Sequence, residues 1–265
     1  MQQHLPSVQK SSVRLSIPSA GEVLRSNLHL CLEFRDKVTV LDTTMEKVEL
    51  WIIVTTLAWI SAPSSADVDQ NQLVKVINEI RNMGINGMYS VAVSIPKDDG
   101  YDLKNVPKPK DEDKKEIENG KKFEKDRIVI AKLNSPEHAE FRVVDNLHLE
   151  SNEGDMLVIF SYASPCDENC AKSGGKYNII DKIKNAIKGG KWENHVFVFE
   201  KIFKPDGNHI TKDKLETALK QLGTFKTDGL KNIFRCYSPT SDAKLQCISC
   251  STNEAVTSAC VDYNL

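Results

Sequence analysis

Hydrophobic residues in segment 70–83 recur three and four positions apart, which is the period of an amphipathic helix. They are Leu73, Val76, Ile77 and Ile80. Glycines at 84 and 87 follow and predict the end of this helix. Similar patterns predict three further helices, at residues 137–149, 164–190 and 210–225.

Strand patterns alternate with these helices. Residues 155–163, DMLVIFSYA, form a nearly continuous hydrophobic run, which is typical of a central strand buried on both faces. The predicted strands are 88–96, 127–133, 155–163, 195–203 and 230–238. This order of elements predicts an α/β three-layer sandwich, with a five-stranded mixed sheet flanked by helices.

The segment 97–126 interrupts this pattern. It holds nine lysines and ten acidic residues, few hydrophobic residues and two prolines. We interpret it as a long solvated loop or a disordered insert, with a substrate-contacting loop as the alternative.

A short hydrophobic segment, Leu50 to Ile60, follows an internal methionine, Met45. Its 11 residues are too few for a membrane-spanning helix, which needs about 20. Small residues come next, so residues 45–66 have the layout of a secretory signal peptide with cleavage after Ala66. A buried helix or strand pair at the edge of the domain is the alternative.

Residues 1–44 show weak periodicity and precede this predicted signal peptide. We interpret them as a disordered segment or an extension upstream of the true start, Met45; a cytosolic isoform is the alternative. The exported chain would then be 67–265, secreted and extracellular, with a globular domain at 67–240 and a cysteine-containing tail at 241–265. If residues 1–44 are translated, we expect a cytoplasmic protein.

The overall composition is that of a soluble globular protein: 40% hydrophobic, 27% charged, with a net charge of −2. This charge argues against a general nucleic-acid coat protein, but a local basic face remains compatible with it. From Asp167 to Arg235 there are 14 basic and 9 acidic residues, a local +5. The excess predicts either a track for a phosphate backbone or an ordinary solvated helix surface.

Two segments carry the candidate chemistry, SPEHAE from Ser135 and SPCDENC from Ser164, and both begin Ser-Pro after a predicted strand. In the first we expect Ser135 to cap a helix and Pro136 to lie in its first turn. In the second, Cys166 and Cys170 are four positions apart, which places both sulfurs on one face of a helix. A helix N-terminus also favours the thiolate, the form that binds metal.

An imidazole from His138 would add a third ligand to these two sulfurs. Three protein ligands with a fourth position left for water are typical of catalytic zinc. Glu140, two residues further on, would lie beside that water and transfer its proton. A local disulfide between Cys166 and Cys170 is the alternative, but bridging these positions within a regular helix strains the geometry.

This two-part pattern resembles the zinc-dependent nucleobase deaminases, which carry H-x-E and, after a spacer, P-C-x2–4-C. Here H-A-E begins at His138, and P-C-x3-C begins at Pro165 after 24 intervening residues. The spacer is similar to that of the AID/APOBEC-like cytosine deaminases, and with the signal peptide the chain looks most like their secreted novel members. The resemblance covers residues 85–240. It implies a cytidine-deaminase-like fold, Zn2+ as cofactor, and cytosine as substrate in a nucleoside, nucleotide or single-stranded DNA or RNA.

The resemblance assigns roles residue by residue. His138, Cys166 and Cys170 match the zinc ligands, and Glu140 matches the proton shuttle. Pro165 matches the motif proline that sets the start of the second helix.

Substrate contacts follow from the same resemblance. Asn134 stands where the family often has an asparagine that binds the substrate sugar. The family usually has Ser-Trp-Ser before Pro-Cys, where this chain has Tyr162, Ala163 and Ser164. Ala163 thus replaces an indole that helps to wall the base pocket, while Tyr162 and Ser164 are candidate substrate contacts. This departure concerns the substrate more than the chemistry.

Four more cysteines lie in the last 30 residues: Cys236, Cys247, Cys250 and Cys260. In an exported chain they predict two disulfides, with three pairings open. A second, structural zinc held by all four is the alternative.

Two functions remain open from the sequence. The first is a secreted zinc-dependent hydrolase that deaminates cytosine. The second is a catalytically inactive extracellular binding module on the same fold. The retained Glu140 favours the enzyme, because a purely structural zinc site has no need of this carboxylate.

Overall fold

The computed structural model describes residues 68–166, 170–172, 174–240 and 242–265, which lie in one compact unit. The predicted extension 1–44 and signal peptide 45–66 lie outside the described residues. The helices are α3 (Gln70–Arg81), α4 (Asp111–Glu118), α5 (Ala139–Val144), α6 (Ile179–Gly189) and α7 (Lys212–Leu222). The strands are β1 (Tyr89–Ile95), β2 (Phe123–Lys125), β3 (Ile128–Lys132), β4 (Asp155–Ala163), β5 (Trp192–Lys201), β6 (Ile233–Tyr237), β7 (Gln246–Ser249), β8 (Ser251–Thr252) and β9 (Ala255–Val256). Short 3-10 turns are η1 (Pro205–Gly207), η2 (Gly223–Phe225), η3 (Gly229–Asn232) and η4 (Ser258–Cys260).

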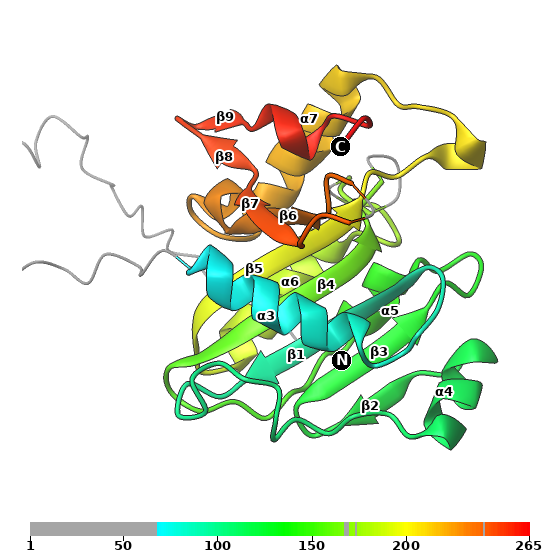
Figure 1. Ribbon diagram of the computed structural model, residues 1–265, viewed down its shortest axis with the longest axis vertical. Coiled ribbons are helices and arrows are strands. Elements are labelled where there is room, and N and C mark those ends of the chain that lie inside the picture. The colour runs from blue at the N-terminus through cyan, green and yellow to red at the C-terminus, as the bar shows by residue number, and fades with distance from the viewer. Residues whose placement is uncertain (1–67, 167–169, 173, 241) are drawn as a thin grey trace, which may run out of the picture. The chain divides into compact units, whose positions relative to one another are not determined.

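A mixed sheet forms the centre of the fold (Figure 1), with strand order β2-β3-β1-β4-β5-β6-β7. Strands β4, β5 and β6 pair in parallel, and the other neighbours in this sheet pair antiparallel. The hydrophobic run that predicted a doubly buried strand is β4, and its first seven residues are buried. The carboxyl end of β4 leads directly into the predicted cysteine motif.

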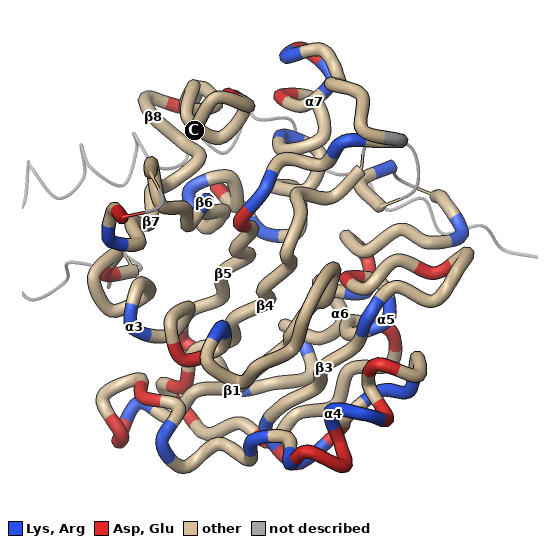
Figure 2. The backbone as a smooth tube through the Cα atoms, turned by 45° about the vertical axis from the view of Figure 1, so that its right-hand side comes forward, with Lys and Arg blue, Asp and Glu red and all other residues tan. Residues whose placement is uncertain are grey.

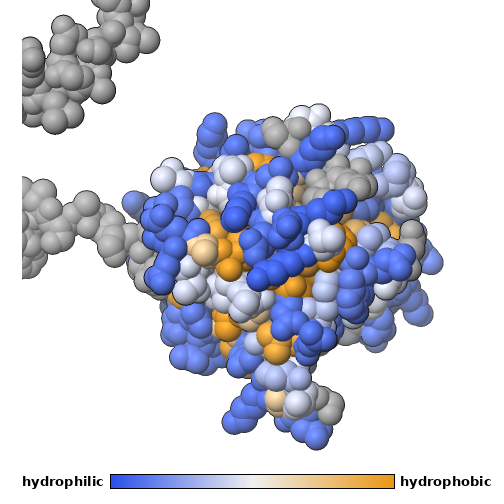
Figure 3. All heavy atoms as spheres, turned by 90° about the horizontal axis from the view of Figure 1, so that it is seen from above, coloured by the Kyte–Doolittle hydropathy of each residue, from blue (hydrophilic) through white to orange (hydrophobic). Residues whose placement is uncertain are grey.

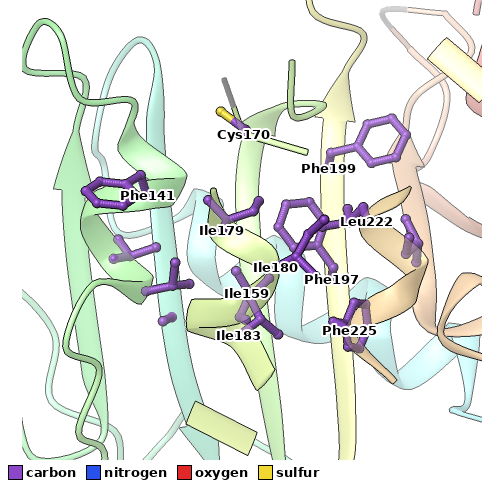
Figure 4. Close-up of a cluster of buried hydrophobic side chains, with 14 of the residues drawn as sticks. Phe141, Ile159, Cys170, Ile179, Ile180, Ile183, Phe197, Phe199, Leu222 and Phe225 are labelled. Carbon is purple, nitrogen blue, oxygen red and sulfur yellow. The ribbon is translucent and has the colours of Figure 1, made fainter. Parts of the chain in front are cut away.

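Helices cover both faces of the sheet. The predicted hydrophobic face of α3 is buried in one core cluster together with β1, β4 and β5 residues. Helices α5, α6 and α7 bury their apolar residues in a second cluster on the other face, part of which is drawn in Figure 4. Along β4, Met156 and Val158 point into the first cluster, while Leu157 and Ile159 point into the second. The predicted three-layer sandwich is confirmed.

The sheet has seven strands, not the five expected from the sequence. Residues 246–249 form β7, which pairs antiparallel with β6, and residues 123–125 form β2, which pairs antiparallel with β3. Each edge of the sheet therefore gains one short strand. Strands this short carry too few residues to show an alternating pattern, and their pairing is set by the neighbouring strand.

The charged segment 97–126 is not a simple solvated loop, because it contains α4 and β2. Basic and acidic residues lie along α4 (Figure 2), but the few hydrophobic residues of the segment are buried. They are Leu103, Val106, Ile117 and Phe123, which join the cluster beneath α3. Acidic residues fill the first turn of α4, where the helix dipole favours negative charge.

The face of the molecule seen from above is mostly polar, and hydrophobic residues show on it only between hydrophilic ones (Figure 3). None of the helices within the described residues combines the length and the apolar character needed to cross a membrane.

Candidate metal centre

Three metal-donor side chains meet at the ends of β3 and β4. His138 is the N-cap residue of α5, Cys166 follows β4, and Cys170 precedes α6. The His138 Nδ1 atom lies 3.7 Å from Cys166 Sγ and 3.2 Å from Cys170 Sγ, and the two sulfurs are 3.3 Å apart. Within the described residues this is the one group of three donors close enough to share a metal ion.

These distances fit a tetrahedral zinc ion. With bonds of about 2.0–2.3 Å, tetrahedral ligand atoms lie about 3.3–3.8 Å from one another. The observed spacings are 3.3 and 3.7 Å, which lie within this range, and 3.2 Å, which lies just below it. The donor types also match, because one imidazole and two sulfurs are a zinc set that leaves a fourth position open.

Both cysteines are buried, and His138 is half-buried. Figure 4 shows Cys170 at the end of the second core cluster, with Ile179 below it. The sulfurs at 3.3 Å are not joined, so the alternative of a local disulfide between Cys166 and Cys170 is wrong. The apolar surroundings exclude water from two of the three donors.

Glu140 lies beside the donor atoms in the first turn of α5. Its Oε1 atom is 3.2 Å from Cys170 Sγ and 3.7 Å from His138 Nδ1. The residue is only 8% exposed. The carboxylate therefore faces the same point in space as the three donors.

Negative charge converging on this point favours bound protons. The hydrogen bond between His138 and Cys166 and the adjacent Glu140 carboxylate raise the pKa of His138 to about 10. A hydrogen bond to Cys166 and burial raise the pKa of the Cys170 thiol. A divalent cation held here would displace these protons, since metal ligands bind in their deprotonated forms.

The His138 side of the site is built by a tight turn and not by a capped Ser-Pro helix start. The backbone N–H groups of Asn134 and Glu137 donate to each other's carbonyls, at 3.0 and 2.9 Å. Helix α5 begins only after His138, so the expectation that Ser135 caps the helix and Pro136 lies in its first turn is wrong. The turn uses Ser135 and Pro136 as its corners, and α5 is shorter than the predicted 137–149.

Arg142 anchors α5, and the sequence alone did not point to it. Its side chain is buried and donates from Nη1 to the Lys132 carbonyl and from Nη2 to the Gly120 carbonyl, both at 2.7 Å. These bonds tie α5 to the end of β3 and to the residues after α4. The position of Arg142 one turn after His138 fixes the donor relative to the sheet.

The cysteine side of the site is also less helical than expected. Helix α6 begins at Ile179, with the Asn178 side chain accepting from the Ile180 N–H at 2.8 Å. The predicted helix 164–190 is thus confirmed in its second half; the described residues of its first half are not helical, and residues 167–169 and 173 lie outside the described residues. The Ala171 N–H donates to the Cys166 carbonyl at 3.0 Å, which holds the residue after Cys170 close to Cys166.

A small pocket adjoins the donor atoms. Its volume is about 20 Å³, which is room for one water molecule. The lining residues are Met88, Tyr89, Leu133, His138, Ala139, Glu140, Ser161, Tyr162, Ala163, Ser164 and Phe203. The candidate contacts Tyr162 and Ser164 are among them. The exposed Asn134 is not, and its side chain lies near Gly120.

Phe203 forms a wall of this pocket, and no motif in the sequence points to it. Its ring centroid lies 6.2 Å from that of His138, and its backbone N–H donates to Ser164 Oγ at 3.0 Å. Met88 and Leu133, each 44% exposed, are two of the three most exposed large hydrophobic residues in the described chain. These two residues give the pocket an exposed hydrophobic rim beside its polar centre.

The four remaining cysteines form two disulfides, Cys236–Cys247 and Cys250–Cys260. This pairing selects one of the three that the sequence allowed. It also rules out the alternative of a second zinc held by all four sulfurs. The first disulfide joins the paired strands β6 and β7.

The fold and the site define a class of protein. Helices on both faces of a mixed sheet, with one histidine and two cysteines gathered around a carboxylate, are the frame and the donor set of the zinc-type nucleobase deaminases. The chain belongs to the family described as secreted novel AID/APOBEC-like deaminase 1, whose model matches residues 70–264. The expected family is confirmed, and the match includes the cysteine-containing tail. No match was found among the curated proteins or among the solved structures.

Proposed function

We propose that this protein is a secreted zinc-dependent hydrolytic deaminase acting on cytosine in a nucleoside, nucleotide or single-stranded nucleic acid. The observation that carries the proposal is the placement of Glu140 Oε1 at 3.2 and 3.7 Å from two of the three donor atoms. His138, Cys166 and Cys170 would hold the metal, and family membership supports the substrate class.

The chemistry divides between the metal and the chain. When bound, zinc supplies Lewis acidity that lowers the pKa of a water molecule toward about 7. Glu140 would accept a proton from the attacking water, whose oxygen would bond to the amine-bearing ring carbon. Glu140 would then deliver that proton to the departing amine. The carbon–nitrogen bond would break and release ammonia, while the second water proton would pass to the adjacent ring nitrogen and leave a carbonyl on the ring.

The other lining residues would bind and orient the base. Tyr162 and Phe203 present aromatic side chains to the pocket, which suits stacking on a flat ring. The hydroxyl of Ser164 accepts from the Phe203 N–H and retains a proton to donate. Asn134 remains a proposed contact for the sugar, because it lies in the turn that leads to His138.

Export is part of the same proposal. Two disulfides are typical of proteins that fold in an oxidising compartment. The predicted signal peptide and the family's description as secreted agree with export.

The basic stretch from 167 to 235 supports a phosphate track only weakly. Several of its lysines on α6 and α7 are paired with carboxylates, including Lys182 with Asp145 at 2.6 Å. Lys201 and Lys204 flank Phe203 and are exposed, so they are the cations that a substrate phosphate would meet first.

One observation favours the non-catalytic binding module as a second candidate. The volume of about 20 Å³ is too small for a nucleobase, so turnover requires the pocket to open. If this protein binds zinc and oligonucleotides while its pocket stays closed, it acts as a binding module and not as an enzyme.

A single experiment separates the two. The purified protein is analysed for zinc content and assayed with cytidine, cytidine nucleotides and single-stranded DNA for uracil products. We expect one zinc per chain, turnover in the wild type, and at least about 1,000-fold lower turnover in Glu140→Gln with zinc retained. Glu112→Gln, which changes an exposed carboxylate in the first turn of α4, is the matched control and keeps full turnover. One zinc per chain with no turnover, or full turnover in Glu140→Gln, would exclude the proposed mechanism.

A further inference from the structure

The loop of residues 202–210, between β5 and α7, carries Phe203 to the pocket wall. Most of this loop is exposed, including Lys204, Asn208 and His209. Its internal backbone bonds are local, such as the Asn208 N–H donating to the Pro205 carbonyl at 2.8 Å. Local turns alone do not fix a loop against the rest of the protein.

One hydroxyl group bridges the two ends of this loop. The Tyr263 hydroxyl donates to the Phe203 carbonyl at 2.9 Å and accepts from the Ile210 N–H at 3.0 Å. Tyr263 lies in the tail, 60 residues after Phe203 in the sequence. The same oxygen therefore ties the residue on the pocket wall to the start of the α7 region.

The ring of Tyr263 contacts two further residues of the loop. The His209 ring stacks on it with centroids 4.1 Å apart and planes 4° from parallel. The Lys204 Nζ atom lies 5.2 Å from the ring centroid, within the range of a cation–π contact. Hydroxyl and ring together contact the loop at four residues.

The tail itself is firmly held, so it can act as a fixed support. The buried Arg235 side chain donates from Nη1 to the carbonyls of Ala259 and Asp262, and from Nη2 to that of Leu265. The Cys250–Cys260 disulfide closes the same segment. The residues on either side of Tyr263 are thereby fixed to β6.

We propose that Tyr263 is a positioning residue that holds Phe203 against the metal centre and so sets the shape of the substrate pocket. Phe203 touches both sides of the site, through its ring beside His138 and its N–H on Ser164. Tyr263 acts on the substrate only through Phe203. The effect on substrate rests on the proposed deaminase function, whereas the effect on the loop does not.

The test is Tyr263→Phe, which keeps the ring and removes the hydroxyl. Its matched control is Tyr101→Phe, which also loses one hydroxyl bond to a carbonyl, that of Gly154 at 3.0 Å, near the opposite end of β4. Amide hydrogen exchange of the Ile210 N–H, zinc content, melting temperature, KM and kcat are measured for wild type and both variants.

We expect the exchange rate of the Ile210 N–H to rise about tenfold in Tyr263→Phe, because the hydroxyl that bonds to Ile210 and Phe203 is gone. KM for the cytosine substrate rises about fivefold, kcat changes less than about twofold and zinc content is unchanged, because no ligand is touched. Tyr101→Phe leaves the exchange of Ile210 and KM as in the wild type.

Two results would overturn the inference. Unchanged Ile210 exchange means that Tyr263 does not hold the loop. Faster exchange with unchanged KM means that the loop does not set the pocket. If the wild type shows no turnover on any cytosine substrate, the proposed function fails, and the exchange measurement alone decides whether Tyr263 holds the loop.

Discussion

Replacing Arg142 by methionine tests whether this side chain positions the histidine half of the metal centre. Methionine keeps most of the aliphatic volume and removes the guanidinium that donates to the carbonyls of Lys132 and Gly120 at 2.7 Å. A hydrogen bond from a charged donor contributes about 1.5–3 kcal/mol, and part of this is recovered by water at the half-buried carbonyls. We therefore expect a loss of about 2–4 kcal/mol in the free energy of unfolding. At about 2–4 °C per kcal/mol, this lowers the melting temperature by about 5–15 °C.

The same substitution should weaken metal binding. Without its anchor the first turn of α5 can shift, and both His138 and Glu140 move with it. Loss of a supporting contact around metal ligands costs about tenfold or more in affinity. Thermal unfolding followed by circular dichroism measures the first effect, and competition with a zinc chelator measures the second.

Arg127→Met is the control, because Arg127 is also largely buried and pairs with Asp155 at 2.7 Å near the other end of β3. It should lower the melting temperature without changing zinc affinity. Equal zinc affinity in wild type and Arg142→Met would refute the positioning argument, and an unchanged melting temperature would refute the energetic one.

Three further predictions follow from buried groups. Burial raises the pKa of Asp155, but hydrogen bonds from Arg127 and two N–H groups outweigh it, so the pKa is lowered. The stability lost in Asp155→Asn at pH 7 should therefore shrink as the pH falls below about 4 and disappear once the pH is below the lowered pKa, as urea midpoints would show. Burial, assisted by Lys226, lowers the pKa of His195 to about 4. Wild type should then lose stability as the pH falls from about 6.5 towards 4, and His195→Leu should lose less between pH 7 and 5. Removing the Cys236–Cys247 disulfide with paired alanines should cost about 2–3 kcal/mol in the denaturant-derived free energy of unfolding; no loss would mean that the β6–β7 pairing is held without it.

Much of the fold was predictable because the relevant signals are local. The spacing of Leu73, Ile77 and Ile80 predicts α3, and the run from 155 to 163 predicts β4. A helix face or a doubly buried strand needs only the residues of its own segment to show its period. The charged segment 97–126 was misread for the opposite reason, since its few buried residues depend on a distant cluster.

The candidate site divides in the same way. The motif residues His138, Glu140 and Cys166 were recognisable from their types and spacing, and the structure brings them together. Arg142 and Phe203 were not, because they act through contacts with residues that lie 10 to 39 positions away.

The sequence by itself determined the family, the layered fold and the donor set, since each depends on residue identity or on a period within one segment. The tertiary structure alone decided the pairing of Cys236 with Cys247 and of Cys250 with Cys260. It also decided the two edge strands, the start of α6 at Ile179, and the hydrogen bond from Tyr263 to the Phe203 carbonyl. Each of these depends on which distant segments become neighbours, and only packing of the whole chain around its sheet selects those neighbours.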